Sequence, residues 1–215
     1  MDFKIKRLIQ RPEKERDVVL YIHGKGGNAQ EAGHYENLFP ECDIVGMDYK
    51  KDTPWETRTE LLEQIKNLSG QYGGIILIAN SIGAFFAMNA LSEEKIKTAF
   101  FISPVVDMEK LITDMLQWAN TTEKELKEQK IIETEFGETL SWEYLDYVRK
   151  NPIKWDIPTQ ILYGEKDHLT SLETVKVFAE KHGAGFTIMK DGEHWFHTDE
   201  QMDFLDKWIM VNYEE

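Results

Sequence analysis

The sequence contains a single cysteine, Cys42, and lacks the run of about 20 apolar residues that a membrane-spanning helix needs. One cysteine cannot form an intramolecular disulfide, so the composition does not point to an oxidising compartment. The first ten residues, MDFKIKRLIQ, also lack the long apolar segment of a secretory signal. These absences predict a cytoplasmic protein that does not insert into a membrane.

Basic residues are scarce as well. The chain has 25 Lys and Arg against 39 Asp and Glu, which gives a formal net charge of −14. Nucleic acids and acidic membrane surfaces bind clustered cations, so both are excluded as expected partners. No metal-ligand spacing such as HExxH is present, and we expect neither a metal nor another cofactor.

Short β-rich segments alternate with stretches of helical periodicity. The segments are VVLYIHG, DIVGMDY, GGIILIANS, TAFFISP and TQILYG, and helices are expected over 57–68, 172–181 and 199–213. This alternation predicts an α/β fold, a mostly parallel sheet with helices on both faces. FKIKRLI near the start and GFTIMKD near the end raise the expected number of strands to about seven, the first of them antiparallel at an edge.

One region breaks this regular spacing. Residues 105–156 separate two expected strands by far more than a crossover helix needs. Apolar residues in this region recur three and four positions apart and predict two helices, one containing Met108, Leu111, Ile112 and Met115 and another containing Trp142, Leu145 and Val148. We therefore expect a single domain, 1–215, with a helical cap inserted at about 105–156 over the carboxyl edge of the sheet.

The pentapeptide ANSIG places Ser81 between an apolar strand and an apolar helix. Small residues two positions before and after a serine let a strand turn sharply into a helix and leave the hydroxyl exposed. Gly83 meets this requirement, and Ala79 replaces the first glycine of the GxSxG pattern. An ordinary serine that caps a helix would produce the same pentapeptide.

A glycine-rich loop follows an earlier strand, in LYIHGKGGN. Such a loop can aim a backbone N–H at an oxyanion, and the N–H of Ile82 at the start of the helix after Ser81 can supply a second donor. Glycine-rich loops also bind phosphate, but the sequence contains neither GxGxxG nor GxxxxGK followed by Ser or Thr. His23 in this loop is expected to brace it rather than to react.

A serine nucleophile requires a base, normally a histidine, and that imidazole requires a carboxylate that orients it. Asp167 lies in a loop just beyond one late strand, and His194 lies just beyond the next. Both should emerge at the sheet edge where Ser81 emerges. Four other histidines have no motif around them and are expected to be surface or supporting residues: His34, His168, His182 and His197.

Together these motifs resemble the α/β hydrolase superfamily over nearly the whole length of the chain. The residues that carry the resemblance are HG after an early strand, SxG at the strand-to-helix turn, and GEKD and GEH after two late strands. The resemblance implies that Ser81 is the nucleophile, His194 the general base and Asp167 its partner. Some members of the family place the acid one strand earlier, which leaves Asp107 as an alternative.

The resemblance also implies an oxyanion hole made by the amides of Ile82 and Lys25, with the amide of Gly26 as the alternative to Lys25. In this family a lid commonly falls where residues 105–156 lie. Side chains of the cap are then expected to form an apolar wall that meets a small acyl group: Met108, Leu111, Met115 and Trp118.

The expected activity is hydrolysis of a small carboxylic ester or thioester through an acyl-enzyme on Ser81. Members of the family also cleave amides or carbon–carbon bonds or transfer acyl groups with the same three residues, and a protein that only binds ligands is a further alternative. The acidic composition disfavours polyanionic substrates such as coenzyme A thioesters. The sequence does not predict the oligomeric state.

Overall fold

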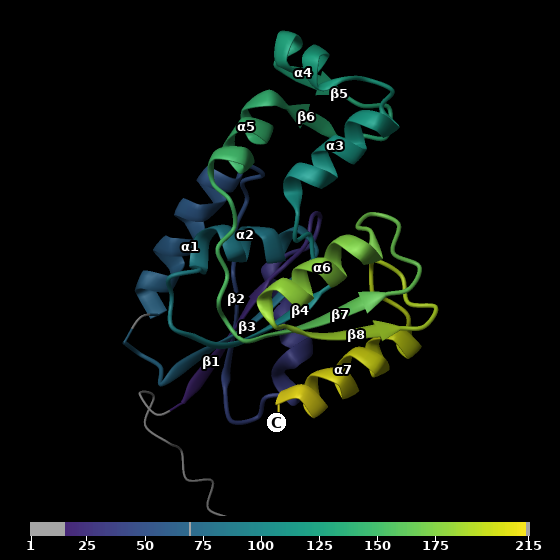
Figure 1. Ribbon diagram of the computed structural model, residues 1–215. Helices are drawn as coiled ribbons and strands as arrows, with labels where there is room; N and C mark the ends of the chain where they lie inside the picture. Colours follow the sequence, from purple (N-terminus) through teal and green to yellow (C-terminus); the bar gives the residue numbers. More distant parts are fainter. Residues whose placement is uncertain (1–15, 69, 214–215) are drawn as a thin grey trace, which may run out of the picture.

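A computed structural model describes residues 16–68 and 70–213, and a parallel sheet lies at its centre (Figure 1). Within these described residues the sheet has six strands, in the order β2-β1-β3-β4-β7-β8. The strands are β1 Asp17–Ile22, β2 Asp43–Gly46, β3 Gly74–Asn80, β4 Ile96–Ile102, β7 Thr159–Gly164 and β8 Gly185–Met189. The predicted mostly parallel sheet is confirmed, and the strand expected from FKIKRLI lies outside the described residues.

Helices cover both faces of the sheet, as predicted. One face carries α1 Pro54–Leu68, α2 Ile82–Leu91 and α6 Leu172–His182, and the other carries the 3₁₀ segment η2 Ala29–Asn37 and α7 Asp199–Tyr213. Successive side chains of a strand point to opposite faces. Leu20 accordingly packs in the apolar cluster of α1, α2 and α6, whereas Val19 and Tyr21 pack in the cluster of η2 and α7.

Strand β3 is buried on both sides, which explains its continuous apolar sequence. Leu77, Ile78 and Ala79 have no exposed surface. β3 lies between β1 and β4 near the middle of the sheet, so the residue that follows it emerges at the centre of the carboxyl edge. That residue is Ser81, one position beyond the end of the strand.

The insertion at 105–156 forms a cap at the top of Figure 1, above the carboxyl ends of the strands. It consists of α3 Met108–Trp118, α4 Glu123–Gln129, an antiparallel pair of strands, β5 Ile131–Glu133 and β6 Thr139–Ser141, and α5 Trp142–Lys150. The two predicted helices are confirmed as α3 and α5. Helix α4 and the β5–β6 strand pair were not predicted individually. A turn at Gly137, with φ of 84°, allows residues 131–141 to pair as a hairpin, and the Thr134 N–H closes it on the Glu138 carbonyl oxygen at 2.9 Å.

The base of the cap rests on α1 and α2. Leu145 of α5 is fully buried in the same apolar cluster as α2. The Tyr147 hydroxyl donates to Asn89 Oδ1 at 3.1 Å, and the Tyr147 ring lies 5.2 Å from that of Trp55. The cap is thus packed against the sheet face that carries α1, α2 and α6.

Candidate active site

Ser81 occupies a backbone conformation that non-glycine residues rarely adopt, with φ of 51° and ψ of −122°. It stands at the start of α2, yet within the described residues its hydroxyl makes no capping hydrogen bond to that helix. The turn is tight because a Cβ at Gly83 would lie 2.4 Å from the carbonyl oxygen of His23. Ser81 therefore does not cap α2 with its side chain, and its hydroxyl can form a hydrogen bond with another group.

The three residues predicted as a triad come together at the carboxyl edge of the sheet. Ser81 Oγ lies 2.8 Å from His194 Nε2, and His194 Nδ1 lies 2.7 Å from Asp167 Oδ2. An ionised carboxylate only accepts hydrogen bonds, so Nδ1 of His194 carries the hydrogen and donates it to Asp167. Nε2 is then left as an acceptor for the Ser81 hydroxyl. A hydroxyl, an imidazole and a carboxylate thus form one continuous chain of hydrogen bonds, which is the arrangement that nucleophilic catalysis by a serine requires.

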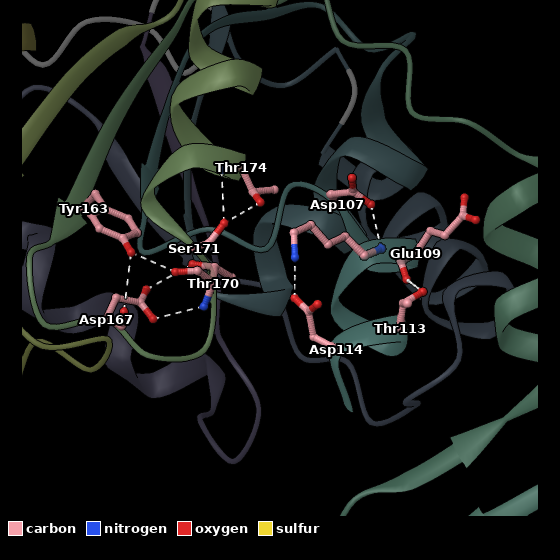
Figure 2. A network of polar contacts seen from close by, with 10 residues as sticks. Asp107, Glu109, Thr113, Asp114, Tyr163, Asp167, Thr170, Ser171 and Thr174 are labelled. Carbon is pink, nitrogen blue, oxygen red and sulfur yellow. Dashed lines mark hydrogen bonds and ion pairs between the residues drawn. The ribbon is translucent and has the colours of Figure 1, made fainter. Parts of the chain in front are cut away.

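Asp167 is held in one orientation by its own loop (Figure 2). Its side chain has no exposed surface and accepts a hydrogen bond from the Leu169 N–H at 2.8 Å. It also accepts from the Thr170 N–H at 3.2 Å and the Thr170 hydroxyl at 3.1 Å. The Tyr163 hydroxyl donates to the Thr170 carbonyl oxygen at 2.7 Å and so braces the loop. Sequence reasoning missed Thr170. Its signal was the DHLT segment, because an aspartate commonly accepts from backbone amides two or three residues further on.

Asp107, the alternative acid, lies elsewhere. Its exposed carboxylate accepts the Lys110 N–H at 2.9 Å and caps the first turn of α3. In Figure 2 it belongs to a network at the start of α3, separate from the one around Asp167. The residue in contact with His194 is therefore Asp167.

The glycine-rich loop passes close to Ser81. A Cβ at Gly24 would lie 3.3 Å from the Cβ of Ser81, and the Gly27 N–H closes the loop on the Gly24 carbonyl oxygen at 3.1 Å. Lys25 and Gly26 line the same cavity as Ser81. Ile82 is the first residue of α2, so its N–H has no acceptor within the helix. The glycine-rich loop and the start of α2 therefore both lie beside Ser81.

His23 packs under the glycine-rich loop and contacts its backbone. Its ring is buried, stacks on Tyr49 at 4.1 Å, and lies with Nδ1 2.8 Å from the Gly24 carbonyl oxygen. The Tyr49 hydroxyl donates to the His23 carbonyl oxygen at 2.7 Å. These contacts agree with a bracing role for His23.

Ser81 and His194 open into a cavity of about 610 Å³. One wall is polar: Asn80 Nδ2 donates to the Tyr21 hydroxyl at 2.9 Å, and that hydroxyl donates to Glu31 Oε2 at 2.6 Å. Burial raises the pKa of Tyr21, which keeps its hydroxyl protonated. The rest of the wall is mainly apolar and includes Ile102, Leu169, Trp195, Phe196, Met202 and Leu205. A volume of this size accommodates a small organic substrate.

The four cap residues expected to meet an acyl group do not line this cavity. Met108 lines a separate cavity of about 540 Å³, Leu111 is buried, Met115 is half-buried against the core, and Trp118 lies exposed with its ring 6.3 Å from that of Phe136. These cap residues do not reach the Ser81 cavity because they pack on the opposite side of the sheet from it. The buried cap residues join the cluster of α1 and α2, whereas Tyr21 and Ile102 place the Ser81 cavity on the face of η2 and α7.

Two further features of the described chain bear on ligands and membranes. Within residues 16–68 and 70–213, no group of three or more His, Cys, Asp or Glu side chains is arranged to hold a metal ion. Across the same ranges, none of the helices is long and apolar enough to cross a membrane.

Comparisons with known proteins identify the fold. No protein-family model and no curated protein matches the sequence. Among solved structures, Est1E from Butyrivibrio proteoclasticus is similar with a TM-score of 0.73 and 16% identity, over 94% of this chain and 88% of that one. Alpha/beta hydrolase domain-containing protein 10 from mouse has a TM-score of 0.73 and 16% identity, over 92% of this chain and 89% of that one. The Paleococcus ferrophilus monoacylglycerol lipase has a TM-score of 0.61 and 15% identity, over 90% of this chain and 94% of that one.

At these identities the similarity concerns the fold. The chain has the α/β hydrolase fold, and the resemblance drawn from its sequence motifs is confirmed at that level.

Proposed function

We propose that the protein is a serine hydrolase that cleaves a small carboxylic ester or thioester. The observation that carries the proposal is the continuous hydrogen-bonded chain from Ser81 through His194 to the fully buried Asp167 carboxylate. A serine hydroxyl is a weak nucleophile at neutral pH, and a histidine base in direct contact with it removes that limitation.

The first half of the reaction forms an acyl-enzyme. Ser81 Oγ attacks the substrate carbonyl carbon while His194 Nε2 takes the hydroxyl proton. The carbonyl oxygen becomes an oxyanion and accepts hydrogen bonds from the amides of Ile82 and of Lys25 or Gly26. When the tetrahedral intermediate collapses, His194 gives its proton to the leaving oxygen or sulfur.

The second half releases the acid. A water molecule attacks the acyl carbon, His194 takes one of its protons, and the bond to Ser81 Oγ breaks as that oxygen regains a proton from His194. The Asp167 carboxylate stabilises the imidazolium that forms in each half. The hydrogen bonds from Leu169 and Thr170 hold this carboxylate in the orientation that contacts His194.

The choice of an ester is supported by the similar structures, which include a monoacylglycerol lipase. A structure of Est1E with bound ferulic acid is also similar, with a TM-score of 0.71 and 16% identity over 96% of this chain and 91% of that one. The Glu31 carboxylate lining the cavity and the net charge of −14 disfavour a polyanionic substrate. Cytoplasmic location, independence of a metal or other cofactor, and the absence of a nucleic-acid partner remain predictions from the sequence.

A protein that only binds ligands is the rival. Its fold would not require an unusual backbone conformation at Ser81 together with a base in contact with the hydroxyl. Both features serve a nucleophile, and this favours turnover over binding alone.

The test is covalent labelling with a fluorophosphonate probe, followed by peptide mapping. We expect labelling at Ser81 and loss of labelling in Ser81→Ala. Ser92→Ala, at the other end of α2, serves as the matched control and should leave labelling intact. Labelling that survives in Ser81→Ala would falsify the assignment of the nucleophile.

A further inference from the structure

Trp195 is the most exposed large apolar side chain in the described part of the protein, with 72% of its surface accessible. It follows His194 directly in the chain and lines the cavity that contains Ser81. An indole ring left in water contributes little to folding, since burial of apolar area is what stabilises the folded state. Because Trp195 lies beside Ser81 and His194, we consider that its exposed ring contacts a bound ligand.

The ring is held in place although it is uncovered. Trp195 stacks on the His197 ring with centroids 4.6 Å apart and planes 19° from parallel. The His197 ring nitrogen Nδ1 donates to the Trp195 carbonyl oxygen at 2.8 Å and lies 3.5 Å from the Glu193 carboxylate. One face of the indole is thus supported by a neighbouring ring, and a support of this kind reduces the entropy lost when a ligand stacks.

The proposed reaction indicates which part of a substrate reaches Trp195. His194 delivers its proton to the leaving oxygen, so the leaving group lies on the His194 side of Ser81. Trp195 belongs to the same loop as His194, between β8 and α7. The group nearest to Trp195 is then the alcohol part of the ester.

We propose that Trp195 binds an uncharged aromatic ring on the alcohol part of the substrate by stacking, so that the enzyme prefers arylalkyl esters to saturated ones. This rests on the proposed function, which it makes more specific. An aromatic ring fits because paired rings are favourable beyond the area they bury. An anionic ring is disfavoured because the Glu31 carboxylate lines the same cavity.

The experiment compares benzyl acetate with cyclohexylmethyl acetate, whose leaving alcohols have similar acidity and size. Trp195→Leu keeps an apolar side chain and removes the ring. We expect the ratio of kcat/KM for the benzyl ester to that for the cyclohexylmethyl ester to fall about two- to tenfold, mainly through KM. Trp195→Phe should retain most of the preference. Methyl acetate, which carries no ring, reports any change in rate that does not depend on the ring, and the ratio for the two ring-bearing esters is compared with it in each variant.

Val211→Ala is the matched control, because Val211 is 61% exposed on α7 and is not among the residues that line this cavity. It should change none of the rates. An unchanged ratio in Trp195→Leu, in a variant that still hydrolyses methyl acetate, overturns the inference and leaves the proposed function standing.

A binding measurement tests the aromatic site independently of the proposed hydrolase activity. Saturation-transfer NMR on Ser81→Ala should detect benzyl alcohol more strongly than cyclohexylmethanol, and Trp195→Leu in the same background should abolish the difference. If the protein hydrolyses no ester but binds benzyl alcohol through Trp195, the proposed function is lost and the aromatic site is kept. Equal signals from the two alcohols overturn the aromatic site.

Discussion

Lys25 Nζ forms an ion pair with the Glu138 carboxylate, although 113 positions separate the two residues in the sequence. Lys25 lies in the glycine-rich loop beside Ser81, and Glu138 lies in the turn of the β5–β6 hairpin of the cap. The cap is thus joined at its hairpin to the loop that is expected to supply an oxyanion donor. Both side chains are partly exposed, 60% for Lys25 and 33% for Glu138.

The first prediction concerns this ion pair. Glu138→Gln should lower kcat for ester turnover by up to about fivefold, because an exposed pair is worth at most about 1 kcal/mol and its loss frees the loop. KM should change little. The effect should shrink as salt is added, since salt screens exposed charges. Steady-state kinetics at low and high ionic strength provide the measurement.

Two further variants control for this reading. Asp17→Asn breaks the Asp17–Lys97 pair at the amino ends of β1 and β4, at the opposite edge of the sheet, and should leave kcat unchanged. The charge exchange Lys25→Glu with Glu138→Lys should restore much of the lost rate. If the exchange restores nothing, the pair does not position the loop.

The second prediction distinguishes the two candidate acids. Asp167→Asn should reduce kcat by about 10⁴-fold, because an amide in place of the carboxylate favours the wrong tautomer of His194. Asp107→Asn should have little effect on kcat or on thermal stability, since asparagine caps a helix as well as aspartate does. The opposite ranking of the two variants in the same ester assay would move the acid to the start of α3.

The third prediction asks whether the cap or the Ser81 cavity selects the acyl group. Met202 lines the cavity and Met115 does not. Met202→Ala should shift the ranking of acetyl, butyryl and hexanoyl esters toward longer chains, by about fourfold for each methylene newly accommodated. Met115→Ala should keep the parental ranking and lower the melting temperature. A changed ranking in Met115→Ala alone would restore the cap residues to the role expected from the sequence.

The fourth prediction concerns the rigidity of the cap. Arg149 of α5 contacts Glu109 of α3 at 2.7 Å and both carboxylate oxygens of Glu123 of α4, at 2.6 and 2.8 Å. The hydrogen bonds from Arg149 hold the pKa of Glu123 below its ordinary value. A carboxyl with a lowered pKa in the folded protein stabilises it above its unfolded pKa, and this contribution is lost as pH falls through the folded pKa.

Arg149→Met should therefore speed amide hydrogen exchange in α4 at neutral pH, by a few-fold given the exposure of the pair. The difference from the parent protein should narrow in acid, once Glu123 is protonated. Lys124→Met removes the Lys124–Glu128 pair within α4 itself and serves as the control. Equal acceleration by both variants would show that any lost charge in α4 has this effect.

The fold class and the candidate catalytic residues could be predicted from local sequence patterns. Apolar strands such as β3 must be buried on both faces, which specifies a parallel sheet, and the last helix is found at Asp199–Tyr213 as predicted from periodicity. Ser81, Asp167 and His194 could be named because each follows a strand, and parallel strands end at one edge. Such signals can be recognised in short segments of sequence, without knowledge of how distant segments pack.

The groups that surround Ser81 could not be predicted, because they come together only through tertiary packing. Periodicity shows that Met108 and Leu111 lie on the apolar face of a helix, but it does not show which side of the sheet that helix packs on. In the structure both residues pack with α2 and do not line the Ser81 cavity. The cavity wall formed by Tyr21 and Trp195 brings together β1 and the loop before α7, which are far apart in sequence. No local pattern encodes that contact, because it arises from how helices pack on the two faces of the sheet.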